Sequence, residues 1–361
     1  MKIKYIFHHA KFFLIKKCVL IFEKELLIFE KLNDYDKLKL IDSKLVNVYQ
    51  HAFQYSPYLR NKYQKAGLSL NSIKGISDIK KIPLLTRNEI TDNREEILTV
   101  NKTNKITINS TGGTTGRPMS FYRNNKLPYE SFYPYYLRKW GLQPYENSDY
   151  VWRMKQISLP NKIFNTIFWF PTKKLKFDGT KLNKTSVKSI VFSLNKYKPS
   201  LIQGYAGSIY QLSKIMFEEG LHLKYIPKAI WITAAPLTYN EKKFIGNIFK
   251  SNVYNEYGSG EIPWIAFQKH HDKNVLHVNN YSRNLEIINK DDNGLGDVIL
   301  TDFFDLSFPK IRYVIGDKAK FSKKSTLHTT IIHPVMGRES DYLLVPNLGK
   351  IDGSFLTTIF N

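Results

Sequence analysis

Cysteine is almost absent from this chain of 361 residues, in which Cys18 is the only one. A single cysteine excludes an internal disulfide framework and a cysteine-based zinc cage. We therefore expect a protein of a reducing compartment. Hydrophobic residues make up 42% of the chain and aromatic residues 14%, which excludes a disordered polypeptide. The length suits two or three packed subdomains around a sizeable core.

A long hydrophobic run is missing from the N-terminus. Residues 5–29 are rich in Ile, Leu and Phe, but charged side chains interrupt them at Lys11, Lys16, Lys17, Glu23, Lys24 and Glu25. This pattern does not predict a spanning helix, and without a small-residue cleavage site it does not predict a signal peptide. Residues 1–34 instead form a basic, apolar helical segment. It packs on the protein's own core or lies on an anionic membrane surface.

Acidic residues are scarce relative to basic ones. The chain has 31 Asp and Glu against 54 Lys and Arg, which gives a formal net charge of +23. Such a charge admits nucleic acid, anionic lipid and phosphate-rich ligands as partners. No compact basic run, zinc finger, basic zipper or RNA-recognition motif is present, so nucleic-acid binding is not expected. We expect a cytoplasmic protein, with the inner face of the membrane as the alternative location.

The hydrophobic pattern predicts an α/β fold with a mostly parallel sheet, because strands and helices alternate through the middle of the chain. Helical spacing covers residues 35–66, and Thr86 stands three residues before Glu89, as in the cap of a helix. The later predicted helices are 186–198, 208–219 and 239–250, and the strands are 106–109, 201–203 and 229–233. Residues 253–254 are expected to open a turn at 255–261. From residue 276 onward, strands at 285–288, 297–301 and 311–315 predict a small antiparallel or barrel-like subdomain.

A Ser/Thr/Gly-rich loop follows the first predicted strand. It consists of Ser110, Thr111, Gly112, Gly113, Thr114, Thr115 and Gly116. Glycines let successive backbone N–H groups approach a ligand, and the hydroxyl groups add donors, so the loop suits phosphate oxygens. It is not a Walker loop, because the Gly-Lys-Ser/Thr sequence is missing. Taken alone, it is also compatible with an ordinary glycine-rich turn.

Three further segments carry candidate chemistry. In residues 254–261, Tyr257 is suited to stack on a planar base, and Glu261, at an expected helix start, is suited to a divalent cation. The strand at 309–317 ends in Asp317, whose carboxylate can accept hydrogen bonds from two ribose hydroxyls. Residues 337–341 form a compact charged turn around Arg338. Each segment also has an ordinary reading, as a capped loop, a strand end or a solvated turn.

The four segments, in this order, resemble those of the adenylate-forming superfamily, which includes acyl-CoA synthetases, luciferases and peptide-synthetase adenylation domains. Within it the sequence is most similar to the phenylacetate–coenzyme A ligase branch and its capsular-polysaccharide relatives. Segments 55–60, 66–68, 79–86, 203–208 and 294–301 share the resemblance, which covers roughly residues 35–345. It implies an adenylate-forming domain over residues 35–337, built of α/β subdomains and a small β-barrel-like subdomain.

The resemblance also implies a reaction and its ligands. ATP and Mg²⁺ activate a carboxylic acid as an acyl adenylate, and the acyl group passes to a thiol such as coenzyme A or to an amine. A role in surface polysaccharide synthesis and a homodimer are further implications. Glu261 and Arg338 are the implied catalytic residues, with Glu261 on the metal. The implied nucleotide residues are Ser110–Gly116, Ala235, Pro236, Glu256, Tyr257, Gly258, Asp317 and Arg338. The implied substrate pocket is Gln203, Gly204, Tyr205, Ala206 and Gly207.

The sequence departs from the family pattern at three places. Met119 follows Pro118 where many members have a lysine, and Ala235 replaces a polar or acidic residue. Beyond Arg338 the family has a mobile lid of about a hundred residues with a charge-stabilising lysine. Only 23 residues follow here, and Lys350 does not match that lysine. We therefore expect residues 338–361 to be a hinge and a truncated lid.

Three hypotheses remain open on the sequence. The protein is an adenylating enzyme, a truncated and catalytically weak nucleotide-binding relative, or a basic peripheral protein that binds anionic lipid or nucleic acid through residues 1–31. Aromatic side chains either shape a pocket for an aryl acid or pack in the core; these are Phe132, Tyr133, Tyr135, Tyr136, Trp140 and Trp152.

Overall fold

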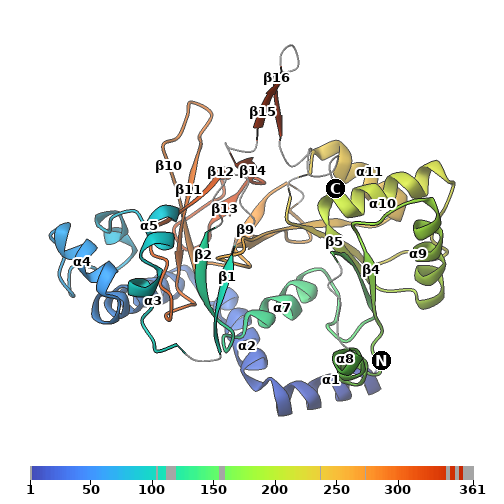
Figure 1. The fold of residues 1–361 in the computed structure, drawn as a ribbon, viewed down its shortest axis with the longest axis horizontal. Coiled ribbons are helices and arrows are strands. Elements are labelled where there is room, and N and C mark those ends of the chain that lie inside the picture. Colours follow the sequence, from blue (N-terminus) through green and yellow to red (C-terminus); the bar gives the residue numbers. More distant parts are fainter. Residues whose placement is uncertain are drawn as a thin grey trace.

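The computed structural model describes residues 2–102, 105–110, 119–153, 159–235, 237–272, 274–338, 342–345 and 349–352 (Figure 1). Its architecture is mixed α/β, with one large sheet flanked by helices and one smaller antiparallel sheet. Over the described ranges, no helix combines the length and the apolar character that a bilayer crossing requires.

The N-terminal segment forms two helices, α1 (Lys2–Ile15) and α2 (Lys17–Lys31). The chain bends at Lys16, whose φ of −136° and ψ of 43° lie outside the helical region. Helix α2 buries one face, formed by Val19, Phe22, Leu26 and Phe29, against the rest of the molecule. This face recurs at spacings of three and four residues, as in any helix packed on a core.

The next segment is helical, as its spacing predicts, and is interrupted at Ser56-Pro57. It contains α3 (Asp34–Tyr55), α4 (Pro57–Lys65), the 3₁₀ turn η1 (Ile76–Lys81), α5 (Arg87–Asp92) and α6 (Arg94–Ile97). Thr86 caps α5 in a reciprocal capping box with Glu89, which confirms the predicted helix start. Just before that cap, the backbone N–H of Leu85 donates to the carbonyl oxygen of Arg312.

The large sheet has eight strands in the order β13-β9-β8-β7-β6-β5-β3-β4. Its parallel part consists of β3 (Ser148–Trp152), β4 (Lys174–Asp178), β5 (Leu201–Tyr205), β6 (Ala229–Thr233) and β7 (Val253–Tyr257). Three antiparallel strands complete it: β8 (Ala266–Phe267), β9 (Leu276–Val278) and β13 (Ile331–Ile332). The predicted mostly parallel sheet is therefore present.

Helices cover both faces of this sheet (Figure 1). The helices on the two faces are η2 (Tyr129–Ser131), α7 (Phe132–Lys139), α9 (Lys184–Tyr197), α10 (Ala206–Glu218) and α11 (Tyr239–Phe249). Helix α8 (Leu159–Trp169) lies beside α1 at the lower rim of the molecule (Figure 1). Alternate strand residues point to opposite faces: Ile230 and Ile232 of β6 pack under α9, α10 and α11, whereas Trp231 packs with α2 and α7. Strands buried on both sides explain the continuous apolar runs in the sequence.

The smaller sheet is antiparallel, in the order β10-β11-β12-β14. Its strands are β10 (Arg283–Ile288), β11 (Leu295–Asp302), β12 (Tyr313–Lys320) and β14 (Met336–Arg338). The sequence assigns the whole region from residue 276 onward to this subdomain, but two of its strands, β9 and β13, belong to the large sheet instead. Two hairpins complete the structure: β1 (Ile106–Ser110) with β2 (Ser120–Asn124), and β15 (Tyr342–Val345) with β16 (Gly349–Asp352).

Two sequence predictions near the site were wrong. Strand β7 continues to Tyr257, so the turn begins three residues later than predicted. Glu261 does not begin a helix; it lies in a non-helical turn between β7 and β8. In that turn the N–H of Ser259 donates to the carbonyl oxygen of Ile262, and Trp264 has a φ of 60°. This geometry reverses the chain so that β8 pairs antiparallel with β7.

Candidate functional site

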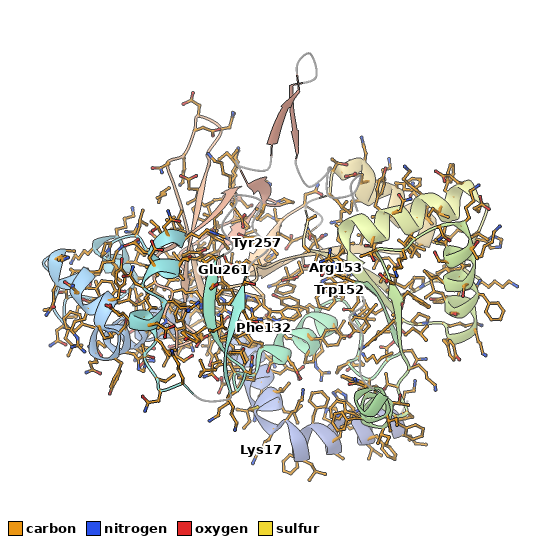
Figure 2. The ribbon with its side chains drawn as sticks, viewed as in Figure 1. Lys17, Phe132, Trp152, Arg153, Tyr257 and Glu261 are labelled. Carbon is orange, nitrogen blue, oxygen red and sulfur yellow. The ribbon has the colours of Figure 1, made fainter. Side chains whose placement is uncertain are left out.

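A cavity of about 890 Å³ lies at the carboxyl ends of the parallel strands. Four of the five parallel strands contribute residues from their carboxyl-terminal half or just beyond it, whereas β4 contributes Lys174 and Lys176 from its first three residues. The residues of the four strands are Trp152 and Arg153 at the end of β3, Gln203–Tyr205 on β5, Thr233 and Ala234 at the end of β6, and Glu256 with 258–260 at the end of β7. Open α/β sheets bind their ligands at this edge. Figure 2 shows Trp152 and Arg153 at one side of the molecule's centre, with Tyr257 and Glu261 towards the other.

The cavity wall is mainly aromatic. Its rings belong to Tyr133, Tyr150, Trp152, Trp169, Tyr205, Trp231 and Trp264. Trp152 and Tyr205 stack with ring centroids 4.0 Å apart, which gives the wall a flat surface. Of the six aromatic residues that the sequence offered for a pocket, only Tyr133 and Trp152 line the cavity. Phe132, Tyr135, Tyr136 and Trp140 pack in the core between α2, α7 and the sheet.

Three cationic side chains, Arg153, Lys174 and Lys176, add positive charge to this aromatic wall. The ammonium group of Lys174 lies 4.7 Å from the centroid of the Trp169 ring and donates to the hydroxyl of Tyr133 at 3.3 Å. No acidic side chain other than Glu256 lines the cavity among the described residues. An apolar cavity with fixed cations suits an organic anion with a hydrophobic body.

The segment predicted as the substrate pocket divides at the end of β5. Gln203, Gly204 and Tyr205 line the cavity, whereas Ala206, the first residue of α10, is fully buried in the core, and Gly207 follows it in that helix's first turn. Gly204 has a steric reason to be glycine. A Cβ atom there would lie 2.4 Å from the carbonyl oxygen of Val151 on the neighbouring strand.

Glu256 is buried at the cavity wall. The hydroxyl of Thr233 donates to its Oε2 atom at 2.5 Å. Burial raises the pKa of Glu256 to about 7, and the hydrogen bond from Thr233 opposes part of that shift. The carboxyl group is therefore close to half ionised at neutral pH.

Tyr257 and Asp317 come together although sixty residues separate them. The hydroxyl of Tyr257, at the end of β7, donates to Oδ2 of Asp317 on β12 at 2.6 Å. In the smaller sheet, Asp317 is the register partner of Arg338 on β14. Three residues that the sequence singled out in separate segments thus occupy one place, where the two sheets meet.

Glu261 lies beside the same strand. Its side chain is buried, and the hydroxyl of Tyr313 on β12 donates to its Oε1 atom at 2.9 Å. Its Oε2 atom is buried without a hydrogen-bond partner among the described residues. A buried carboxylate oxygen without a partner fits a hard divalent cation. No group of three His, Cys, Asp or Glu side chains gathers in this part of the chain. A cation on Glu261 would therefore need further oxygen ligands from water, backbone carbonyl groups or a bound anion.

The glycine-rich loop, from Thr111 to Pro118, lies outside the described residues, but its two ends are placed. Ser110, which is exposed, pairs with Ser120 across the β1–β2 hairpin. Met119 is buried, with its sulfur 3.5 Å from the hydroxyl of Tyr313. Farther along β2, Arg123 donates to the carbonyl oxygen of Gly260. The loop therefore leaves and re-enters the fold beside the turn that holds Glu261.

The remaining predicted nucleotide residues follow the ends of β6 and β7. Ala234, with a φ of 73°, lines the cavity, whereas Ala235 packs against the core beneath α10 and α11. Pro236 lies outside the described residues. Gly258 lines the cavity, and a Cβ atom there would lie 2.9 Å from the backbone nitrogen of Trp264.

Sequence reasoning missed much of the cavity wall. Lys174 is the first residue of β4, and Trp264 follows Pro263 in the turn before β8. Neither residue belongs to a motif. The residues of the wall are scattered along the chain between 133 and 264, so no short sequence pattern identifies them. Arg283, paired with Asp302 in the interior at 2.6 Å, donates to the carbonyl oxygen of Pro263. This buried pair holds the turn that carries Trp264.

Comparisons with known proteins place these features in context. No family model matches the chain. It is 24% identical over 342 residues to Protein CapK of Staphylococcus aureus, covering 90% of this chain and 72% of that protein. A structure of 2-hydroxyisobutyryl-CoA ligase in the postadenylation state with 2-HIB-AMP has a TM-score of 0.70 at 16% identity. It covers 91% of this chain and 73% of the ligase.

The open conformation of the same ligase, with 2-HIB-AMP and CoA, gives a TM-score of 0.67 at 16% identity. It covers 90% of this chain and 79% of that one. The two similarities show a shared fold.

Proposed function

We propose that this chain, a CapK-like member of the adenylate-forming superfamily, activates a carboxylic acid with ATP and transfers the acyl group to a thiol or an amine. One observation carries the proposal. The aromatic, cationic cavity shares its β7 wall with the turn that holds Tyr257 and Glu261, and Tyr257 contacts Asp317. An acid bound in the cavity and a nucleotide bound at this turn would be neighbours.

The reaction has two steps. A carboxylate oxygen of the acid attacks the α-phosphorus of ATP, and the bond to pyrophosphate breaks, which gives an acyl adenylate. The thiol or amine then attacks the carbonyl carbon, the bond to AMP breaks, and the attacking group loses its proton. The chain's contribution is to hold the two reactants in line and to stabilise negative charge.

Residues of the site divide this work. Lys174, Lys176 and Arg153 attract the carboxylate into the cavity, and the aromatic wall holds the body of the acid. Asp317 is oriented by the hydrogen bond from Tyr257, and its carboxylate accepts hydrogen bonds from the ribose hydroxyls. The backbone N–H groups of residues 110–116 and the guanidinium of Arg338 bind phosphate oxygens.

A magnesium ion fits Glu261. The hydroxyl of Tyr313 holds one oxygen of this carboxylate and leaves the other without a described partner. When bound, the ion neutralises polyphosphate charge during pyrophosphate departure.

Coenzyme A is the acceptor that we propose first, because the structure of 2-hydroxyisobutyryl-CoA ligase with 2-HIB-AMP and CoA has this fold. The resemblance to the capsular-polysaccharide branch favours a role in surface polysaccharide synthesis. The aromatic wall favours an acid with a planar or hydrophobic body over a short hydrophilic one.

The test is acid-dependent exchange of labelled pyrophosphate into ATP, with purified full-length protein and a panel of aryl and short-chain acids. We expect exchange with at least one acid. Glu261→Gln keeps the shape of the side chain but removes its charge, and should lower the exchange rate about 10²- to 10³-fold. Glu218→Gln, on the exposed surface of α10, is the matched control and should leave the rate unchanged.

Two outcomes count against the proposal in different ways. ATP binding without exchange for any acid would identify a nucleotide-binding relative that lacks catalysis. Absence of both ATP binding and exchange would remove the nucleotide site altogether.

A further inference from the structure

Large apolar side chains are exposed on two helices that lie side by side, α1 and α8. On α1 the apolar residues given below recur at separations of three, four and seven positions and so share one face of the helix. The exposed apolar residues are Ile3, Ile6, Phe7, Phe13 and Leu14 on α1, Ile163, Phe164 and Ile167 on α8, and Phe170 directly after α8. We call this surface the α1–α8 face. Leu14 is 80% exposed and Ile167 is 70% exposed.

Contacts between the two helices make the face continuous. The rings of Phe7 and Phe170, both exposed, meet edge to face with centroids 6.1 Å apart. On the opposite side of α1, Phe12 is buried against Phe168 and Trp169. Lys11 donates to the carbonyl oxygen of Phe168 at 2.6 Å. Helix α1 is thus fixed on α8 by one side and leaves its most apolar side uncovered. Figure 1 shows both helices at the lower rim of the molecule.

The border of the face is mainly basic. Residues 1–22 contain five lysines and no acidic residue, and residues 159–173 contain two lysines and no acidic residue. One acidic side chain from outside these segments, Glu130, pairs with Lys16. Lys17 extends from the lower rim of the molecule (Figure 2). Contiguous exposed apolar surface marks an interaction site. A lysine-rich border favours a partner that carries negative charge. A second copy of this chain would set lysines against lysines, whereas anionic lipid headgroups would neutralise them.

We propose that the α1–α8 face docks this protein on an anionic lipid bilayer, with its apolar side chains among the acyl chains and its lysines at the headgroups. This goes beyond the proposed catalytic function and does not depend on it. The docked orientation has a consequence for the cavity. Trp169, the last residue of α8, lines the cavity, and Lys11 of α1 lies 5.0 Å from its ring. Docking would therefore hold the cavity beside the lipid surface.

The experiment is flotation of the full chain with two kinds of vesicle, one of phosphatidylcholine alone and one with 30 mole per cent phosphatidylglycerol. We expect binding to the anionic vesicles that is at least tenfold stronger than to the neutral ones and that weakens with added salt. Two variants test the apolar side: Ile6→Gln/Phe13→Gln/Leu14→Gln on α1 and Ile163→Gln/Phe164→Gln/Ile167→Gln on α8. Each should weaken binding at least tenfold.

A matched control replaces three exposed apolar residues elsewhere, Phe192→Gln/Ile226→Gln/Leu327→Gln, and should bind as the unchanged chain does. Glutamine supports helix formation, and circular dichroism and thermal unfolding check that each variant folds. Three results would overturn the proposal: no binding to anionic vesicles, equal loss in the control, or binding unaffected by the face variants. If the chain instead forms a dimer that the face variants abolish, and does not bind vesicles, the face is a site of self-association. Pyrophosphate exchange in solution should not change in any of these variants, which separates this test from that of the proposed function.

Discussion

Burial among aromatic side chains raises the pKa of Glu256 to about 7, from an ordinary value near 4.5. Below pH 7 the carboxyl group is neutral, and the cavity then presents only cations to an incoming acid. Above pH 7 it carries a negative charge that repels the carboxylate of the substrate. Glu256 therefore makes the affinity of the cavity for the acid depend on pH near 7, which the lysines alone would not do.

The first prediction concerns this residue. The KM for the acid in the exchange assay should rise as the pH increases from 6 to 8, and Glu256→Gln should flatten that rise. Because the folded-state pKa is raised, the free energy of unfolding should also decrease between about pH 4.5 and 7, less so in the variant. A KM profile that is equally steep in both proteins would contradict this role. Urea unfolding at each pH measures the free energy of unfolding.

At the residue scale, the sequence identified side chains whose chemistry stands out in a motif. Tyr257, Asp317 and Glu261 were found in this way, and the structure brings them to one place where the two sheets meet. Their proposed roles toward a nucleotide stay predictions. Lys174 and Trp264 were not found, because a lysine or tryptophan outside a motif looks the same in a core, on a surface or in a cavity wall.

On strand β5, a single glycine determines how closely the neighbouring strand β3 can approach. Gly204 pairs with Val151 of β3, and a Cβ atom at this position would lie 2.4 Å from a backbone carbonyl oxygen. Gly204→Ala should therefore push β3 and β5 apart, with a loss of about 1–3 kcal/mol in the free energy of unfolding. Since both strands end at the cavity, the KM for the acid should increase as well.

Gly246→Ala is the matched control for this substitution. Gly246 lies within α11, and its added Cβ atom would lie 3.4 Å from the nearest atom, the carbonyl oxygen of Ser251. Alanine is the better helix former by about 1 kcal/mol, so this variant should be at least as stable as the unchanged chain. Chemical denaturation of both variants measures the difference. Equal stability of the two would show that β3 and β5 tolerate the extra atom.

Elements with strong local signals were predicted well. The capping pair Thr86 and Glu89 and the alternation around β5 and β6 needed no distant partner to be recognised. The turn at Glu261 was predicted wrongly, because a carboxylate after two glycines also fits a helix start. Its geometry is set by antiparallel pairing of β7 with β8 and by the hydrogen bond from Arg283 to Pro263. The N-terminal segment is helical as predicted, but it is divided into two helices, because the backbone of Lys16 is not helical.

At the scale of the whole molecule, the large and the small sheet meet at the proposed nucleotide site. Tyr257 belongs to the large sheet and Asp317 to the small one, so a bound nucleotide would contact both. Ligands that bind only the folded state raise its stability by mass action, by about 2.7 kcal/mol at a hundred times the dissociation constant. ATP with Mg²⁺ should accordingly raise the Tm by roughly 3–5 °C.

Metal removal provides the control for this prediction. EDTA should reduce the shift produced by ATP, and Glu261→Gln should show a reduced shift that EDTA changes little. Differential scanning calorimetry measures both. A full shift for Glu261→Gln, still sensitive to EDTA, would place the metal on another residue.

The sequence by itself determined the fold class, the order of the segments and the identity of the residues at the junction of the sheets, because periodicity, capping and loop chemistry are local properties. Only the tertiary structure decided which aromatic side chains line the cavity and which fill the core. It also decided that α8 joins α1 in one exposed apolar face. Such outcomes depend on contacts between residues far apart in the chain, and burial is a property of the packed molecule that no local pattern contains.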